Sequence, residues 1–117
     1  MAERPSDGDA LLRALSALAN PHRLRIIAAL NAGSTYVSQL ARDLGIGRPL
    51  LHMHLQRLEA AGLVEGRLEL SDDGKAQRWY SVTDFAIQLD ASAIAAAEPS
   101  LTTPPPSDGR TKGTSYE

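Results

Sequence analysis

Apolar residues recur every three or four positions along the first half of the chain, a spacing that predicts amphipathic helices. The first helix is predicted in the segment GDALLRALSALAN, where Asp7 or Asp9 can cap the start. A second helix is predicted to open with Asn20 as its N-cap and Pro21 at its first position, and to end at Gly33. Its apolar stripe is expected to consist of Leu24, Ile27, Ala28 and Leu30.

A closely spaced pair of helices follows. The segment STYVSQLARDLG predicts a short third helix, whose apolar stripe is Val37, Leu40, Ala41 and Leu44. Only the residues Gly45 to Gly47 separate it from a fourth helix, predicted from about Arg48 to Ala61. The fourth helix carries Leu51, Leu55 and Leu58 on one face. Two helices joined by a short glycine-containing turn indicate a helix-turn-helix.

After Gly62 the apolar period changes from about 3.6 residues to about 2, which predicts strands. LVEGRLEL and QRWYSVT alternate, and the turn signal SDDGKA between them predicts a β-hairpin. The segment DFAIQLDASAIAAAE predicts an Ala-rich last helix from Asp84 to Glu98. The predicted fold class is mainly α with a small β-hairpin (α+β), a winged helix-turn-helix.

The composition changes towards the ends of the chain. The 117 residues suit one small domain, expected over residues 7–97, with a flexible N-terminus at residues 1–6. Residues 98–117 are rich in Pro, Ser, Thr and Gly and are expected to form a disordered tail. No apolar run approaches the roughly 20 residues of a membrane span, and no signal peptide pattern is present. We therefore expect a soluble, cytoplasmic protein without a membrane partner.

The absence of cysteine excludes disulfides, thiolate metal sites and cysteine nucleophiles. No serine–histidine–aspartate constellation, phosphate-cradling glycine loop or paired-carboxylate motif stands out either. We therefore expect neither an enzyme nor a bound cofactor.

Three stretches carry a resemblance to a known family: ALSALANPHRLRIIAAL, VSQLARDLGIGRPLLHMHLQRLEAAGLV and GKAQRWYSVTD, together about residues 14–84. They resemble the winged-helix transcriptional regulators of the ArsR type and their MarR-like relatives. The resemblance implies a regulator that binds double-stranded DNA, with repression by promoter blocking as the simplest mechanism. The metal-sensing branch of that family uses cysteines near the third helix, or Asp and His on the last helix. This chain lacks cysteine and has no histidine on its predicted last helix, so no metal site is expected.

Two histidines of the predicted fourth helix require a separate interpretation. His52 and His54 lie ~200° apart around a helix axis, so one ion cannot bind both from the same face. His54 is expected at the edge of the leucine face, in a structural role, and His22 is expected to be a solvated surface residue. A zinc site that joins His52 to a second subunit is the alternative.

The outward face of the fourth helix and the hairpin are expected to contact DNA. The expected contact residues are Arg48, Leu50, His52, Met53, Gln56 and Arg57 on the helix and Lys75, Gln77 and Arg78 in the hairpin, or wing. Leu50 and Met53 can touch a thymine methyl group, or they can pack on the protein itself or on a partner. The alternative for the wing is a solvated hairpin without a ligand.

Charge weakens the case for DNA. Residues 34–80 hold six basic and six acidic side chains, so a single subunit should bind DNA weakly. Two subunits on paired half-sites would compensate. The alternative function is a protein-interaction module with Leu50 and Met53 as apolar anchors. A homodimer is expected, and its interface is predicted to comprise Leu11, Leu12, Leu15, Leu18, Phe85, Ile87, Leu89 and Ile94. A monomer is the alternative, and no effector can be named.

Overall fold

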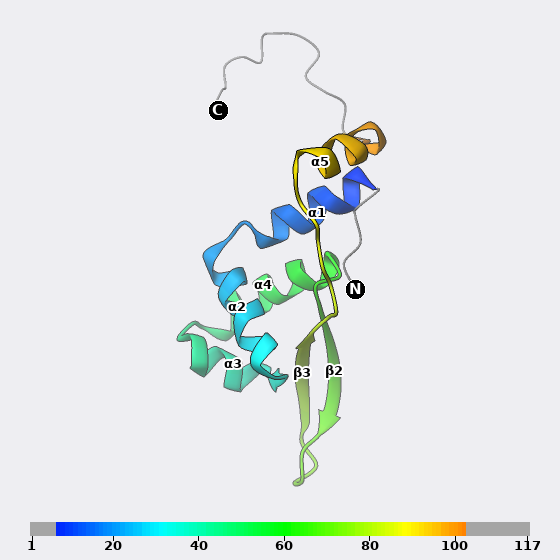
Figure 1. Cartoon of the computed structure of the whole chain (residues 1–117). Helices are drawn as coiled ribbons and strands as arrows, with labels where there is room; N and C mark the ends of the chain where they lie inside the picture. The colour runs from blue at the N-terminus through cyan, green and yellow to red at the C-terminus, as the bar shows by residue number, and fades with distance from the viewer. Residues whose placement is uncertain (1–6, 103–117) are drawn as a thin grey trace.

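The computed structural model describes residues 7–102, so the N-terminus (1–6) and residues 103–117 of the expected tail lie outside the described residues. The elements are α1 (Gly8–Leu18), α2 (Pro21–Ala32), β1 (Thr35–Tyr36), α3 (Val37–Leu44), α4 (Arg48–Ala60), β2 (Val64–Leu70), β3 (Ala76–Val82), α5 (Ala91–Ala97) and a 3₁₀ turn, η1 (Glu98–Ser100). In Figure 1 the β2–β3 hairpin projects from one end of the molecule, while α5 lies against α1 at the other. Within residues 7–102 no helix has the length and apolar character needed to cross a membrane.

The predicted helix-turn-helix and hairpin are confirmed, and the helix ends have the expected chemistry. Asn20 caps α2, because its side chain accepts hydrogen bonds from the backbone N–H groups of His22 and Arg23. Between α3 and α4, Gly45 adopts a left-handed conformation with φ 69°, which a glycine reaches at little cost. These local signals place the two helices of the motif correctly. The fold is a winged helix-turn-helix.

The sheet has three strands rather than the two of a simple hairpin. Its order is β1-β3-β2, all antiparallel, with Thr35 opposite Tyr80 and Tyr36 opposite Trp79. The sequence placed Ser34 and Thr35 before the third helix, which starts at Val37, but it did not predict the short strand β1 there. A threonine and a tyrosine suit a strand, and the Tyr36 ring lies 5.4 Å from the Trp79 ring.

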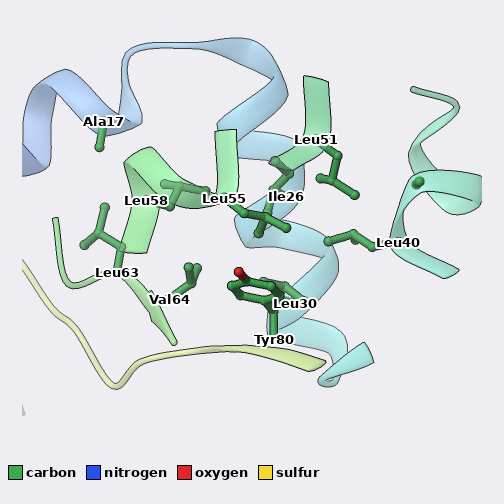
Figure 2. Packing of buried hydrophobic residues seen from close by; sticks show 11 residues of the cluster. Ala17, Ile26, Leu30, Leu40, Leu51, Leu55, Leu58, Leu63, Val64 and Tyr80 are labelled. Carbon is green, nitrogen blue, oxygen red and sulfur yellow. The ribbon is translucent and has the colours of Figure 1, made fainter. Parts of the chain in front are cut away.

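The core lies between α2, α3, α4 and the sheet (Figure 2). The predicted leucine row of α4 is fully buried, and Tyr80 of β3 packs with it. The predicted stripe of α2 was partly wrong: Ile26 and Leu30 are buried, whereas Leu24 is 54% exposed. The adjacent isoleucines at 26 and 27 leave the rotation of this helix ambiguous in sequence, and packing against α4 and β3 decides it.

The last helix is shorter than predicted. It begins at Ala91, where the Asp90 side chain accepts a 2.7 Å hydrogen bond from the Ala93 N–H. Residues 83–90 instead run as extended chain from β3 to α5 (Figure 1). The expected helical positions of Phe85, Ile87 and Leu89 are therefore wrong. Their spacing of two residues fits extended chain, in which alternate side chains share a face.

The first residues of the expected disordered tail are ordered, which corrects the domain boundary at residue 97. Residues 98–100 form η1, and the N–H of Gly8 donates a 2.7 Å hydrogen bond to Ser100 Oγ. The backbone N–H and the hydroxyl of Thr102 donate to the Asp9 carboxylate at 3.0 and 2.7 Å. Composition indicated disorder because it ignores such polar contacts to a distant helix start.

Gly66 provides a test of the packing between β2 and β3. A Cβ at this position would lie 2.8 Å from the Tyr80 ring, which is buried and cannot move aside freely. We expect Gly66→Ala to lower the free energy of unfolding by about 1–3 kcal/mol, measured by urea denaturation. The neighbouring exposed change Glu65→Ala should stay within about 0.5 kcal/mol of the original protein. Equal stability of the two variants would contradict this packing.

Candidate nucleic-acid interface

The outer face of α4 is exposed along its length. Arg48, His52 and Gln56 follow one another at four-residue spacing, so they form one row on the helix surface. All three are exposed, whereas Leu51 and Leu55, about a quarter turn away around the helix, are fully buried. The structure therefore brings the predicted polar residues of this helix together.

Two large apolar side chains of α4 are also exposed. Leu50 is 41% exposed and Met53 is 39% exposed, so each is partly covered by its own protein and partly open to solvent. Both alternatives for these residues remain open, since the same exposed area suits a thymine methyl group or an apolar partner. No other side chain on this face of α4 is apolar and large.

His54 lies on the buried side of α4, away from His52. It is 2% exposed, and its Nδ1 accepts a hydrogen bond of 3.1 Å from Arg23 Nε. The other ring nitrogen, Nε2, is buried without a hydrogen-bond partner among the described residues. Since Nδ1 is the acceptor, the geometry assigns the proton of the neutral ring to Nε2. The expected structural role of His54 fits this environment.

Arg23 connects three helices. Besides His54, its guanidinium donates from Nη1 to the backbone carbonyls of Ser16 and Ala17, both at 3.3 Å. These carbonyls belong to the last turn of α1, where helical acceptors lack intrahelical donors. Sequence reasoning did not assign a role to Arg23. Arg23 follows the helix-opening Pro21 by two residues, and this local sequence does not indicate a contact with His54, 31 residues away.

The surroundings of His54 oppose its protonation. Burial of the imidazole is the main cause that lowers the pKa of His54 below its ordinary value of 6.5. The positive charges of Arg23, His22 and Arg57 act in the same direction. His22 was expected to be a solvated surface residue, but its ring is partly buried and lies 5.3 Å from the His54 ring.

Arg57 is separated from the polar row of α4 formed by Arg48, His52 and Gln56. It lies in the last turn of the helix and lines a cavity between α4 and α1. The exposed row formed by Arg48, His52 and Gln56 does not include it.

The residues of the wing that were predicted to contact DNA lie at its tip and on both faces of the hairpin. Lys75 lies in the turn between β2 and β3, where its N–H donates to Ser71 Oγ at 3.2 Å. Gln77 and Arg78 are adjacent on β3, so their side chains point to opposite faces of the hairpin. One flat surface therefore cannot contact both residues.

The charged groups of the wing are largely engaged within it. Arg78 Nε donates to the Tyr80 hydroxyl at 3.4 Å, a contact that raises the pKa of Arg78 above its ordinary value. The Ser71 hydroxyl and the Lys75 N–H donate to the Asp73 carboxylate, and these bonds lower the pKa of Asp73. Arg67 pairs with Glu69. Glu69 is therefore paired with a cation, whereas Asp73 keeps its negative charge and is held by hydrogen bonds.

Two large apolar side chains of the wing are unusually exposed. Leu68 is 65% exposed and Leu70 is 76% exposed, and both lie on the same face of β2 as Gly66. Sequence reasoning assigned them to an alternating strand but proposed no contact for them. The alternation itself was visible, but it does not reveal which strand face lacks a covering element.

The predicted dimer residues divide into three groups by exposure. Leu12, Leu89 and Ile94 are 47–49% exposed. Leu11 is buried within the protomer, and Leu18 and Phe85 pack against its core, so these three are not free for a second subunit. Leu15 and Ile87 are partly buried. Between α1 and α5 lies an apolar groove of about 180 Å³, lined by Leu12, Leu15, Ile94 and Leu101 among others.

Among residues 7–102, no three His, Asp or Glu side chains gather closely enough to hold a metal ion. His52 and His54 in particular do not form a pair, since one is exposed and the other is buried on opposite sides of α4.

Comparison with known proteins gives consistent results. Residues 20–66 match the family model described as "Bacterial regulatory protein, arsR family". An HTH-type transcriptional regulator of Methanocaldococcus jannaschii is 37% identical over 78 residues, which cover 67% of this chain and 81% of that protein. The HTH-type transcriptional regulator CmtR of Mycobacterium tuberculosis is 36% identical over 96 residues, which cover 76% of this chain and 81% of CmtR.

Solved structures with the same fold include two regulators. One is the solution structure of a homodimeric winged helix-turn-helix DNA-binding domain from Mycobacterium bovis, with 32% identity and a TM-score of 0.57, covering 63% of this chain and 64% of that chain. The other is the transcriptional repressor BigR from Xylella fastidiosa, with 27% identity and a TM-score of 0.55, covering 78% and 79% of the two chains.

The buried imidazole of His54 predicts a specific pH dependence of stability. Because the pKa of His54 is lowered in the folded protein, the unfolded chain takes up a proton that the folded chain resists. Neutral His54 makes its full contribution to the free energy of unfolding above about pH 6.5. As the pH falls below this value, the free energy of unfolding decreases by up to about 1.4 kcal/mol per pH unit. Urea denaturation from about pH 7.5 to about pH 5.5 measures it.

His54→Gln is the matched control for that measurement. It removes the ionisable ring but keeps an oxygen that can accept from Arg23. Its free energy of unfolding should fall less steeply on acidification than that of the original protein. Identical pH dependence in both proteins would contradict the assignment to His54.

Proposed function

Because the chain belongs to the arsR family of bacterial regulatory proteins, and is a winged helix-turn-helix transcriptional regulator rather than an enzyme, we propose how it acts. As a homodimer in the cytoplasm, it binds specific sequences of double-stranded DNA and represses transcription by occupying the promoter. One observation carries this proposal: α4 exposes a row of polar side chains while its leucines are fully buried.

In this proposal α4 enters the major groove with its N-terminal half foremost. Arg48 lies in the first turn, where a guanidinium can bind guanine through two hydrogen bonds or contact a phosphate. Gln56 can bind adenine through its amide, and His52 can donate to either kind of base edge. Leu50 and Met53 contact thymine methyl groups with the area that they expose.

The wing supplies contacts to the DNA backbone. Lys75 at the tip reaches a phosphate, as a flexible ammonium group can do from several positions. Gln77 and Arg78 lie on opposite faces of the hairpin, so they contact the two walls of a groove rather than a single strand. A hairpin inserted into the minor groove would satisfy this arrangement.

A dimer compensates for the lack of net positive charge on a single subunit. With six basic and six acidic residues between positions 34 and 80, one subunit has little net attraction for phosphate. Two subunits double the number of contacts and read paired half-sites. The apolar groove between α1 and α5, with Leu12 and Ile94 half exposed, is the surface we propose for this pairing. The Mycobacterium bovis relative is described as homodimeric.

A second candidate function is favoured by the exposed leucines of the wing. Leu68 and Leu70, together with Leu50 and Met53, offer apolar surface that a protein partner would bury. In this case the complex would respond little to salt, whereas DNA binding falls steeply as salt rises. A salt titration of each complex therefore distinguishes the two functions.

The proposed DNA surface can be tested with arginine variants. Arg48→Ala and Arg78→Ala, alone and combined, should weaken binding to selected genomic fragments at least about tenfold, since one lost contact costs about 1–3 kcal/mol. Fluorescence anisotropy at modest salt measures the affinity. Arg25→Ala removes the same charge from an exposed site on α2 and should leave the affinity unchanged. An unchanged affinity and footprint of the combined variant would show that the assigned surface is wrong.

The dimer surface can be tested with a charge placed in the groove. Leu12→Asp and Ile94→Asp should each shift the protein to monomers, because burying an unpaired carboxylate costs several kcal/mol. Sedimentation velocity measures the oligomeric state. Leu24→Asp introduces the same group at a 54% exposed leucine of α2 and should leave the dimer intact. A dimer that persists in both groove variants would assign pairing to another surface.

A further inference from the structure

A second cavity, unrelated to the exposed row of α4, lies between α1, α2 and the C-terminal end of α4. Its volume is about 480 Å³. Small-molecule sites in proteins commonly measure roughly 300–1,000 Å³. The cavity is therefore large enough for a compact organic molecule, and its lining decides which kind.

Three guanidinium groups from three helices line this cavity: Arg13 of α1, Arg23 of α2 and Arg57 of α4. Arg23 is committed through Nε and Nη1 to His54 and to two carbonyls of α1. Arg13 and Arg57 form neither a hydrogen bond nor an ion pair with any residue in the described range 7–102. Their donors are available to a ligand.

The cavity lining contains one acidic side chain. Asp9 contributes a carboxylate to the lining, and Thr102 already binds that carboxylate through its backbone N–H and its hydroxyl. Three cations and one anion leave the lining with an excess of two positive charges. Such an excess in a concave site attracts an anion.

The rest of the lining is mainly apolar. Leu12, Ala17, Ala60 and Ala61 supply aliphatic surface beside the arginines. A bare inorganic anion would leave this surface hydrated, whereas a molecule with one anionic group and a small apolar body would cover it. Arginine is suited to the anionic group, because its planar fork binds a carboxylate or phosphate through two hydrogen bonds.

Structural roles explain the positions of two of the three arginines. Arg23 satisfies the carbonyls at the end of α1, and Arg57 lies in the last turn of α4, where a cation stabilises the helix dipole. Arg13 lies in the middle of α1 and has no such role. It attracts Asp9, one turn earlier, without pairing with it.

We propose that the cavity between α1, α2 and α4 binds a small organic anion, a carboxylate or phosphate monoester with a compact apolar body, held by Arg13 and Arg57. This site goes beyond the proposed DNA binding, and binding there is measurable on the protein without DNA.

Benzoate and phenyl phosphate are suitable probes, with benzyl alcohol as the uncharged molecule of the same shape. Titration of the ¹⁵N-labelled full chain should shift backbone amide signals of α1 and of the last turns of α4. Saturable shifts are expected with at least one of the two anions, and weaker, non-saturating shifts with the alcohol. Equal binding of benzyl alcohol, or an absence of saturable shifts with both anions, would overturn the proposal.

Two variants and a control locate the site. Arg13→Gln and Arg57→Gln should each weaken binding of the anion about tenfold, the loss expected for one charged hydrogen bond. Arg25→Gln removes an exposed arginine outside the cavity and should leave the affinity unchanged. The spectrum of each variant reports whether it is folded. If Arg25→Gln weakens binding as much as Arg57→Gln, the anion responds to net charge alone and the proposal fails.

Discussion

The rotation of α4 about its own axis depends on Leu51, Leu55 and Leu58, which are fully buried between α2, α3 and the sheet. A shift of the helix by one residue would turn it by about 100° and expose leucines, each at a cost of about 1.5–3 kcal/mol. The same shift would bury polar side chains. Because the leucine row is fixed in this way, the orientation of the exposed row that begins with Arg48 is fixed as well. The surface proposed to read DNA is thus determined by packing rather than by its own residues.

One polar group interrupts the buried side of α4, and it carries the connection to α1. His54 is tolerated there because Arg23 donates to its Nδ1 and also satisfies two carbonyls at the end of α1. The guanidinium therefore joins the helix proposed to face DNA to the helix that carries Leu12 in the apolar groove. A displacement of α1 in the proposed dimer would have to break these bonds or move α4 with it.

The parts of the fold that depend on local patterns were predictable. Asn20, Pro21 and Gly45 mark helix ends through their own backbone preferences, and the change of period after Gly62 indicates the hairpin. Features that depend on distant contacts were not. The strand at Thr35 exists because β3 pairs with it, and the contact between Arg23 and His54 spans 31 residues.

The last helix illustrates a different limit of sequence reasoning. The alanines after Asp90 favour a helix, and this preference was extended backwards over residues 84–89. The alternation of Phe85, Ile87 and Leu89 contained the correct signal, an extended chain with one apolar face. Phe85 packs against the core from this extended segment, which a helix begun at Asp84 would have rotated away.

The position of charges matters more than their sum when a nearly neutral domain approaches a polyanion. Along α4 the first acidic residue is Glu59, in the last turn, while Arg48 occupies the first turn. The N-terminus of a helix also carries a partial positive charge. The end of α4 proposed to meet the bases is therefore locally positive, although basic and acidic residues balance over positions 34–80. In the wing, Glu69 is paired with Arg67, which reduces the repulsion that this carboxylate would exert on phosphate. In the proposed dimer, a second subunit would present the same local field again, one half-site away, so affinity would grow without any change in net charge per chain.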